Sequence, residues 1–291
     1  MSLMSKSKSG FEMVWVRRIS KNCSAESWHF HSGLRDLTLS LDASVMNGVN
    51  PAGQLMTLEL DTQKGGGAVR NPVVIHGVDD KALVDRHFAW VPVGKEYILR
   101  DMWGFLAYIE DPALRAFYQS VLSDDDIMQP FFQGRASHQY HHEHVGGLLE
   151  HSYEVASTAA SLCWQHKVGS LSACVAFVGG LLHDIGKIHL YYNQSKGIGV
   201  CGQHESFNFL VLAKPLDKLR VSSPKVFEAI CSCLAIKLGH HADAYLPATM
   251  VHLCDRLSVD VCNWRRAFAG APPYYWYAKS TQGEQLYKRL G

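Results

Sequence analysis

A long apolar stretch that ends in a histidine and an aspartate constrains this chain more than any other feature. Residues 175–182 carry no polar side chain, and His183 and Asp184 follow them directly. A helix with so little polar surface lies inside a protein, so both polar side chains start at the end of a buried helix. A buried imidazole or carboxylate is unfavourable unless it is paired or bound to a metal.

Two further predicted helices place the same residue types on their apolar faces. His151 lies three residues after Leu148 and four before Val155, so it shares their helical stripe. Asp255 follows Val251 by four residues and falls on an inward face in the same way. A single histidine on such a stripe is usually a hydrogen-bonded core residue, and a single His-Asp pair is usually a helix cap. Polar groups that converge from several helices favour a metal site instead.

The composition limits the class of protein. With 291 residues, 47% of them hydrophobic and 19% charged, the chain is globular and long enough for one large or two ordinary domains. Its net charge of +1 neither demands nor excludes a polyanionic partner. Eight cysteines without a Cys-x-x-Cys pair favour reduced thiols. Because no apolar run reaches the ~18 residues of a membrane span, we expect a cytoplasmic protein without a membrane segment.

The hydropathy pattern divides the chain in two and predicts an α+β fold. Residues 11–98 are expected to be β-rich, because 37–41 and 56–60 alternate apolar and polar residues and short β-type runs occur at 14–16, 73–75 and 88–91. These strands predict a small barrel or sandwich. Residues 99–291 are predicted to be all-α, with Asp101 capping one helix and Ser223-Pro224 opening another that ends at Gly239. Residues 1–10 are expected to be a tag or disordered.

The joint pattern of these polar residues resembles the HD-superfamily phosphohydrolases, in which a helical histidine, a His-Asp pair and a late aspartate bind metal. The run Gly179-Gly180-Leu181-Leu182-His183-Asp184-Ile185-Gly186-Lys187 carries the resemblance. It implies that His151, His183, Asp184 and Asp255 hold one ion and that Asp184 bridges to a second. His204, His240 and His241 fall where HD-GYP phosphodiesterases place extra histidines, and would complete the second ion. For the pair His240-His241 the alternative is a solvated helix end.

The expected cofactors are two divalent metal ions. Imidazole and carboxylate ligands suit manganese, iron or nickel, with magnesium as an alternative, and the lack of cysteine ligands disfavours structural zinc. Two such ions about 4 Å apart activate water and clamp phosphate oxygens. Asp184 and Lys187 are the expected catalytic residues, with Lys187 neutralising the substrate phosphate; the alternative for Lys187 is a lysine at a helix C-terminus. Arg135, His141 and His142 are expected to contact substrate, unless they are ordinary surface residues.

Residues 101–154 are similar to the segment that enters the HD domain in the YhaM-like 3′→5′ exoribonucleases. The shared features are a helical lead-in, the pair His141-His142, the turn Gly146-Gly147-Leu148 and then His151. The two glycines also resemble a phosphate-binding loop, although a turn and cap is the simpler interpretation. The resemblance implies an OB-like N-terminal domain and a phosphodiesterase that acts on 3′ ends of single-stranded RNA or DNA. Trp15, Trp28 and Trp90 would then stack bases, unless they are core residues.

Three alternatives stay open. The chain could be a phosphohydrolase of nucleotides or cyclic nucleotides, which its non-basic composition allows. The run at 146–152 also resembles the HD-containing region of TraI-type relaxases, which implies a DNA-mobilisation module. A regulatory module with a degenerate site is the non-enzymatic alternative. The aromatic tail at 274–277 matches no motif; it would pack on the helical core or on a second subunit, so a homo-oligomer is also open.

Overall fold

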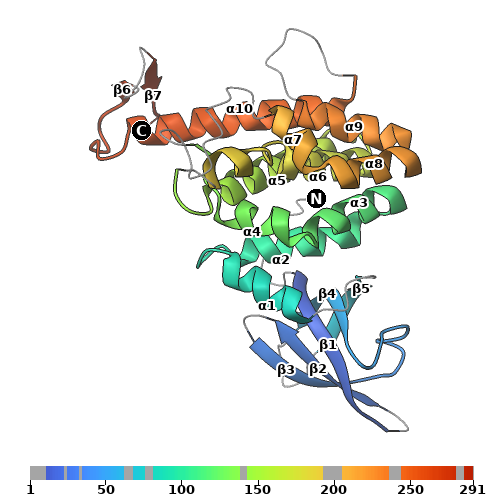
Figure 1. The fold of residues 1–291 in the computed structure, drawn as a ribbon. Coiled ribbons are helices and arrows are strands. Elements are labelled where there is room, and N and C mark those ends of the chain that lie inside the picture. The colour runs from blue at the N-terminus through green and yellow to red at the C-terminus, as the bar shows by residue number, and fades with distance from the viewer. Residues whose placement is uncertain are drawn as a thin grey trace.

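The fold consists of a β-sheet at one end and a larger helical body stacked on it (Figure 1). The computed structural model describes residues 11–22, 25–32, 35–61, 68–75, 81–137, 143–192, 205–235, 244–279 and 285–290. Residues 1–10, for which a tag or disorder was expected, lie outside these ranges. Within the described ranges, the N-terminal part is an antiparallel sheet and the remainder is mostly helix, which agrees with the predicted α+β class.

The sheet has five antiparallel strands in the order β3-β2-β1-β4-β5. The predicted alternating segments 37–41 and 56–60 are confirmed as parts of β3 and β4. The longest strand, β1, lies at the centre and pairs with both β2 and β4. The strand bounds are β1 Phe11–Lys21, β2 Glu26–Ser32, β3 Arg35–Leu41, β4 Gln54–Asp61 and β5 Ala68–Val74.

Each face of the sheet has its own apolar partner. Val14 and Trp28 belong to a separate cluster that Met46 and Val49, from the β3–β4 connection, help to cover. Side chains on the opposite face of the sheet, such as Met13, belong to the core of the helical body. The expected OB-like barrel is therefore not formed by the described strands. In an open sheet β3 and β5 are the two edges, and its faces are buried by a loop and by helices instead of by closure.

The junction between sheet and helical body contains two local differences from the sequence-based prediction. The run at 88–91 was predicted as β, but residues 88–90 belong to helix α1 (Lys81–Trp90), because packing of its apolar side overrides the β-propensity of its aromatic residues. Helix α2 (Glu96–Gly104) begins before Asp101, so Asp101 is no N-cap; it accepts a hydrogen bond from the Tyr153 hydroxyl. The 3₁₀ helix η1 (Phe105–Tyr108) then leads into α3.

The helical body is arranged around two long antiparallel helices, α5 and α6, which α9 and α10 cover (Figure 1). Its elements are α3 Pro112–Leu122, α4 Asp125–Gln133, α5 Gly147–Gln165, α6 Ser170–Leu182, the π-helix η2 Ile188–Tyr192, α7 Glu205–Val211, α8 Ala213–Ser222, α9 Pro224–Leu234 and α10 Leu246–Ala267. Helix α9 starts at Pro224 as predicted but ends at Leu234, before the expected stop at Gly239, which lies outside the described residues.

Two glycines let α6 approach its neighbours closely. A Cβ on Gly180 would lie 2.8 Å from the Cα of Ala156 on α5, and a Cβ on Gly179 would lie 2.5 Å from the Cβ of Cys233 on α9. Both glycines therefore serve packing, because a larger side chain at either position would push the helices apart. The result is that the end of α6 is held between α5 and α9.

Beyond α10 the chain forms a small hairpin, β6 (Tyr277–Lys279) and β7 (Leu286–Lys288), at the far end of that helix (Figure 1). None of the helices in the described part of the chain is both long and apolar enough to cross a membrane.

Candidate metal centre

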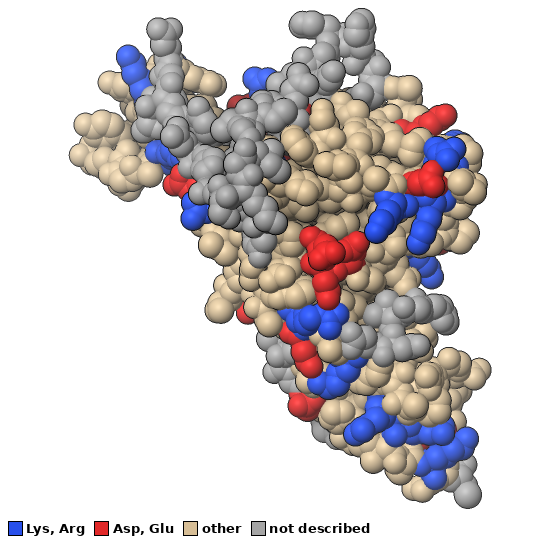
Figure 2. Space-filling view, viewed as in Figure 1, with Lys and Arg blue, Asp and Glu red and all other residues tan. Residues whose placement is uncertain are grey.

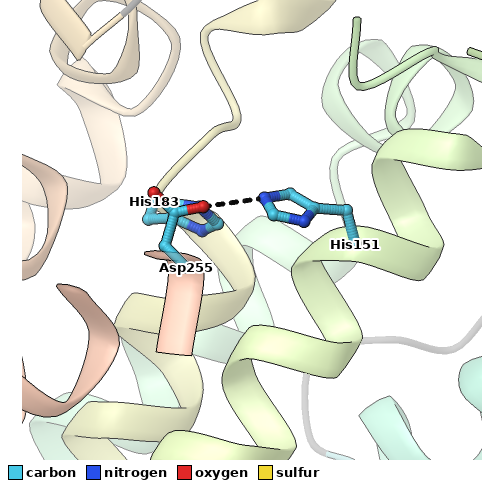
Figure 3. A group of neighbouring side chains, drawn as sticks. All are labelled: His151, His183 and Asp255. Carbon is cyan, nitrogen blue, oxygen red and sulfur yellow. Dashed lines mark ion pairs between the residues drawn. The ribbon is translucent and has the colours of Figure 1, made fainter. Parts of the chain in front are cut away.

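Three helices bring four polar side chains to one point inside the helical body. Figure 3 shows three of them, His151, His183 and Asp255. His151 points inward from the first turns of α5, and Asp255 comes from the middle of α10. His183 and Asp184 come directly after α6. His151 is 0% exposed, His183 2% and Asp184 3%, whereas the Asp255 side chain is 32% exposed. The predicted inward orientation of all four residues agrees with this burial.

The donor atoms of these four residues form a compact cluster. The His151 Nε2 lies 3.3 Å from the Asp184 Oδ2 and 3.2 Å from the Asp255 Oδ1. The His183 Nε2 lies 3.5 Å and 3.6 Å from the same two oxygens. Ligand atoms that share one cation at about 2.1 Å stand about 3.0–3.4 Å apart in tetrahedral or octahedral geometry. The separations in the cluster are close to these edge lengths.

Both imidazoles are held through their second nitrogen, which leaves Nε2 turned toward the cluster. The Nδ1 of His183 donates to the Gly180 carbonyl oxygen at 2.7 Å. The Nδ1 of His151 lies 3.2 Å from the Ser258 hydroxyl, which in turn donates to a Glu154 carboxylate oxygen at 3.1 Å. Such outer partners fix the tautomer that a metal-binding histidine needs.

The cluster is also a strongly coupled set of charges. Burial lowers the pKa of His151, but the Asp184 and Asp255 carboxylates outweigh this and raise it to about 9. Burial raises the pKa of Asp255, but the neighbouring imidazoles of His151 and His183 outweigh this and hold it below its usual range. The carboxylates thus favour positive charge between them, which a proton or a metal cation supplies.

Lys187 places a further charge beside the cluster. Its Nζ lies 2.5 Å from the Asp184 Oδ2, and the residue is only 9% exposed. Lys187 belongs to the short turn after α6, three residues beyond Asp184, as the sequence suggested. Two carboxylates against one ammonium leave the cluster one negative charge when the histidines are neutral, which suits a divalent cation.

The donor set fits a divalent metal ion. The Nε2 of His183 is a buried atom that makes no hydrogen bond within the described part of the chain. The ligand atoms of His151, His183 and Asp255 all lie within 4.8 Å of one another. Two neutral imidazoles with carboxylates suit manganese, iron, nickel or zinc by chemistry alone.

Several residues predicted from the sequence to belong to the site lie outside the described residues. These are His204, His240 and His241 of the expected second ion, and His141 and His142 of the expected substrate mouth. Arg135 is described and is exposed just beyond α4; it makes no ion pair with the cluster within the described part of the chain.

The turn before α5 does not offer a free phosphate cradle. Gly146 has a φ of +79°, in the left-handed region that favours glycine. The amide of Gly147 donates to His144 at 2.9 Å, and the amide of Leu148 donates to Gly134 at 3.1 Å. Because both N–H groups are already used, the glycines form a turn and cap.

Three residues near the cluster escaped the sequence analysis: Glu154, Ser258 and Asn208. The first two could have been found, because each lies three residues beyond a donor on the same helix and hence on the same face. Asn208 of α7 is fully buried; it accepts from the Gly186 amide at 2.7 Å and donates to the carbonyls of His183 and Leu234. It ties the turn carrying Asp184 to α9, and nothing in the local sequence marks it.

Comparison with known proteins finds a family match for part of the helical body. Residues 148–260 match the HD domain family, and all four clustered residues lie inside the matched segment. HD domains belong to the superfamily of metal-dependent phosphohydrolases and bind divalent metal ions, so this segment is consistent with a metal-dependent hydrolase. No curated protein and no solved structure is similar enough to the chain to match it. The likeness to YhaM-like exoribonucleases and to TraI-type relaxases stays a prediction.

Proposed function

We propose that this chain is a metal-dependent phosphodiesterase that acts on the 3′ ends of single-stranded RNA or DNA. The observation that carries the proposal is the cluster of His151, His183, Asp184 and Asp255, whose donor atoms are 3.2–3.6 Å apart inside an HD domain. A divalent ion bound by these residues supplies Lewis-acid chemistry, which polarises phosphate oxygens and lowers the pKa of water.

The side chains around the donors prepare the site for a phosphate ester. Gly180 and Ser258 hold the two imidazoles so that both Nε2 atoms face the carboxylates. Lys187 keeps an ammonium group beside Asp184, where it can neutralise charge on a bound phosphate. The burial of the cluster reduces screening by water, which strengthens these interactions.

The proposal includes a second ion. Asp184 would bridge the two ions, and His204, His240 and His241 would complete the second. Titration with Mn²⁺, followed by metal analysis, counts the ions: we expect two per chain in the parent protein and one after His240→Ala with His241→Ala. One ion per chain in the parent protein would contradict the second ion site but not the first.

The burial of the cluster supports a chain end as the substrate. Three of the four donors are almost completely enclosed, and Asp255 alone is one-third exposed. A duplex is too broad to reach such a site without opening, whereas the end of a single strand is narrow. Arg135, His141 and His142 are proposed to guide that end.

The test uses the full chain loaded with Mn²⁺ and short RNA and DNA oligomers labelled at the 5′ end. We expect stepwise shortening from the 3′ end, and loss of more than a hundredfold in rate with Asp184→Asn, because this change removes a donor and the partner of Lys187. Asp217→Asn is the matched control, since Asp217 is exposed on α8 and, among the described residues, bonds only Arg220. Unchanged activity in Asp184→Asn would contradict the site.

A second candidate is a phosphohydrolase of nucleotides or cyclic nucleotides, which the enclosed donors also suit. The same Mn²⁺-loaded protein separates the two functions. Hydrolysis of free nucleotides or of a generic phosphodiester, with labelled strands left intact, would assign the small-molecule function instead.

A further inference from the structure

The end of the chain beyond α10 exposes four consecutive aromatic side chains. Tyr274 is 79% exposed, Tyr275 49%, Trp276 57% and Tyr277 49%. Their rings form two adjacent pairs, with centroids 5.4 Å apart for Tyr274 and Tyr275 and 5.1 Å apart for Trp276 and Tyr277. Exposed aromatic side chains on this scale are uncommon without a partner, because each carries a large apolar area.

This aromatic segment is fixed to the end of α10 by hydrogen bonds. The Arg289 side chain donates to the carbonyls of Tyr275 and Pro272, and its amide donates to the Trp276 carbonyl. The indole of Trp264 on α10 donates to the Lys288 carbonyl at 3.1 Å. The Arg289 guanidinium also lies 4.7 Å from the centre of the Phe268 ring. These contacts therefore hold the backbone of the aromatic segment against α10, with the rings exposed to solvent.

Basic side chains accompany these rings along the chain. The described residues from 261 onward include lysines and arginines but no aspartate or glutamate. The basic residues are Arg265, Arg266, Lys279, Lys288 and Arg289. Lys288 lies 5.3 Å from the centre of the Trp276 ring, so one cation is interleaved with the aromatic rings. Figure 2 shows Lys and Arg side chains beside the projection that this hairpin forms at the upper left.

Interleaved rings and cations favour a polyanion with flat groups over a second copy of this chain. A two-fold interface would place the same patch against itself, and so bring Lys279, Lys288 and Arg289 against their own copies. A single-stranded nucleic acid instead offers bases that stack on the rings and phosphates that pair with the cations.

The position of the patch relative to the metal cluster agrees with this partner. Helix α10 carries Asp255 and ends at Ala267, seven residues before Tyr274, the first residue of the aromatic segment. Eleven residues separate Asp255 from Arg266, which is about 16 Å along the helix at 1.5 Å per residue. A strand of a few nucleotides covers such a distance.

We propose that the surface formed by residues 274–277, Lys279, Lys288 and Arg289, named the aromatic platform, binds single-stranded nucleic acid several nucleotides away from the end held at the metal cluster. This inference rests on the proposed function for its biological setting, but binding at the platform is measured separately. It also moves the expected base-stacking surface away from the N-terminal tryptophans: Trp28 is 1% exposed, and Trp15 and Trp90 pack against the core.

The test measures binding of labelled single-stranded and duplex oligomers to the full chain in EDTA, where hydrolysis cannot occur. We expect single strands to bind more tightly than duplex, with affinity falling as salt rises. Trp276→Leu should weaken single-strand binding about tenfold, and Lys288→Ala should reduce the salt dependence. Tyr108→Leu, at a partly exposed tyrosine in η1, and Lys225→Ala, at an exposed lysine of α9, are the matched controls and should bind like the parent chain.

Each outcome decides the inference without reference to catalysis. Equal single-strand affinity in the parent chain and in Trp276→Leu overturns it. A second result also overturns it: the parent chain is a dimer, Trp276→Leu is a monomer, and both bind the nucleic-acid strands equally well. The platform is then a subunit interface. If the Mn²⁺-loaded parent chain leaves labelled strands intact while Trp276→Leu still weakens strand binding in EDTA, the proposed function alone is contradicted.

Discussion

At the residue scale, the orientation of His151 depends on two hydrogen bonds in series, from its Nδ1 to Ser258 and from Ser258 to Glu154. The Ser258 hydroxyl accepts a hydrogen bond from the His151 imidazole and donates one to the Glu154 carboxylate. Ser258 therefore connects α10 to two side chains of α5. A ligand histidine anchored in this way keeps its Nε2 lone pair available and loses little freedom on metal binding. Ser258 is therefore a positioning residue.

We predict that Ser258→Ala lowers the affinity for Mn²⁺ about tenfold, the low end of the range for loss of an outer partner. The change removes the acceptor for the His151 Nδ1, while Ser258→Thr keeps the hydroxyl and should restore the affinity. Isothermal titration of the metal-free protein measures both. Ser232→Ala is the control, because within the described part of the chain its hydroxyl bonds only the Glu228 backbone carbonyl of α9. Equal affinity in Ser258→Ala and Ser258→Thr would show that the hydroxyl has no positioning role.

Single residues of the site were predictable where helical periodicity applies. The inward placement of His151 and Asp255 followed from their spacing to Leu148 and Val251. Asn208 was not predictable, because its three partners come from the turn after α6 and from α9, which only the tertiary fold brings together. The expected N-cap at Asp101 was wrong because α2 begins five residues earlier, and the carboxylate meets Tyr153 instead.

At the element scale, the position of the His-Asp pair depends on how closely α6 packs against α5. Gly180 makes this approach possible, since the atom nearest to an added Cβ is backbone, the Cα of Ala156, at 2.8 Å. Backbone atoms cannot rotate away, so any side chain at residue 180 moves one helix relative to the other. His183 lies three residues further on and would move with α6.

We predict that Gly180→Ala destabilises the protein by about 2 kcal/mol, within the range for overpacking, and also weakens Mn²⁺ binding. Urea unfolding and metal titration measure the two effects. Adding Ala156→Gly should not restore stability, because the close contacts are with the Ala156 Cα and amide nitrogen. Full rescue by Ala156→Gly would mean that the side chain, not the backbone, limits the approach.

Elements were predictable to the extent that their local pattern decided their structure. The alternation at 37–41 and 56–60 predicted two strands correctly. In β3 the apolar Leu39 and Leu41 are buried, whereas Thr38 and Ser40 are exposed. The run at 88–90 was assigned as β for its aromatic residues, but Phe88 and Trp90 pack against the core from a helix. Whether the sheet closes into a barrel could not be predicted from a local pattern, because closure requires the edge strands β3 and β5 to pair.

At the scale of the whole molecule, the sheet and the helical body share one hydrophobic core. Met13, Leu55 and Ile75 of the sheet belong to the same cluster as the buried residues of α5 and α6. His87 lies at this junction; it is completely buried and contacts the rings of Trp90, Trp103 and Phe132. Its Nδ1 accepts from the Trp103 indole at 3.3 Å, a bond that protonation of this nitrogen would break.

Acid should therefore destabilise the whole molecule through His87. Burial, assisted by Arg86, lowers the pKa of His87 to about 3 in the folded protein, whereas the unfolded chain has the ordinary value of 6.5. Between these values the unfolded chain binds the proton and the folded protein does not, so stability falls as the pH falls below 6.5. From pH 7 to pH 5 this amounts to about 2 kcal/mol.

Urea unfolding of the parent chain and of His87→Leu at both pH values tests this prediction. The loss of stability from pH 7 to pH 5 should be about 2 kcal/mol smaller in the variant. The comparison cancels the opposite contribution of His151, whose raised pKa favours the folded state as the pH falls toward 6.5. Because the core is shared, the signals of the sheet and of the helices should shift together. An equal loss in both proteins would show that His87 accepts a proton while folded.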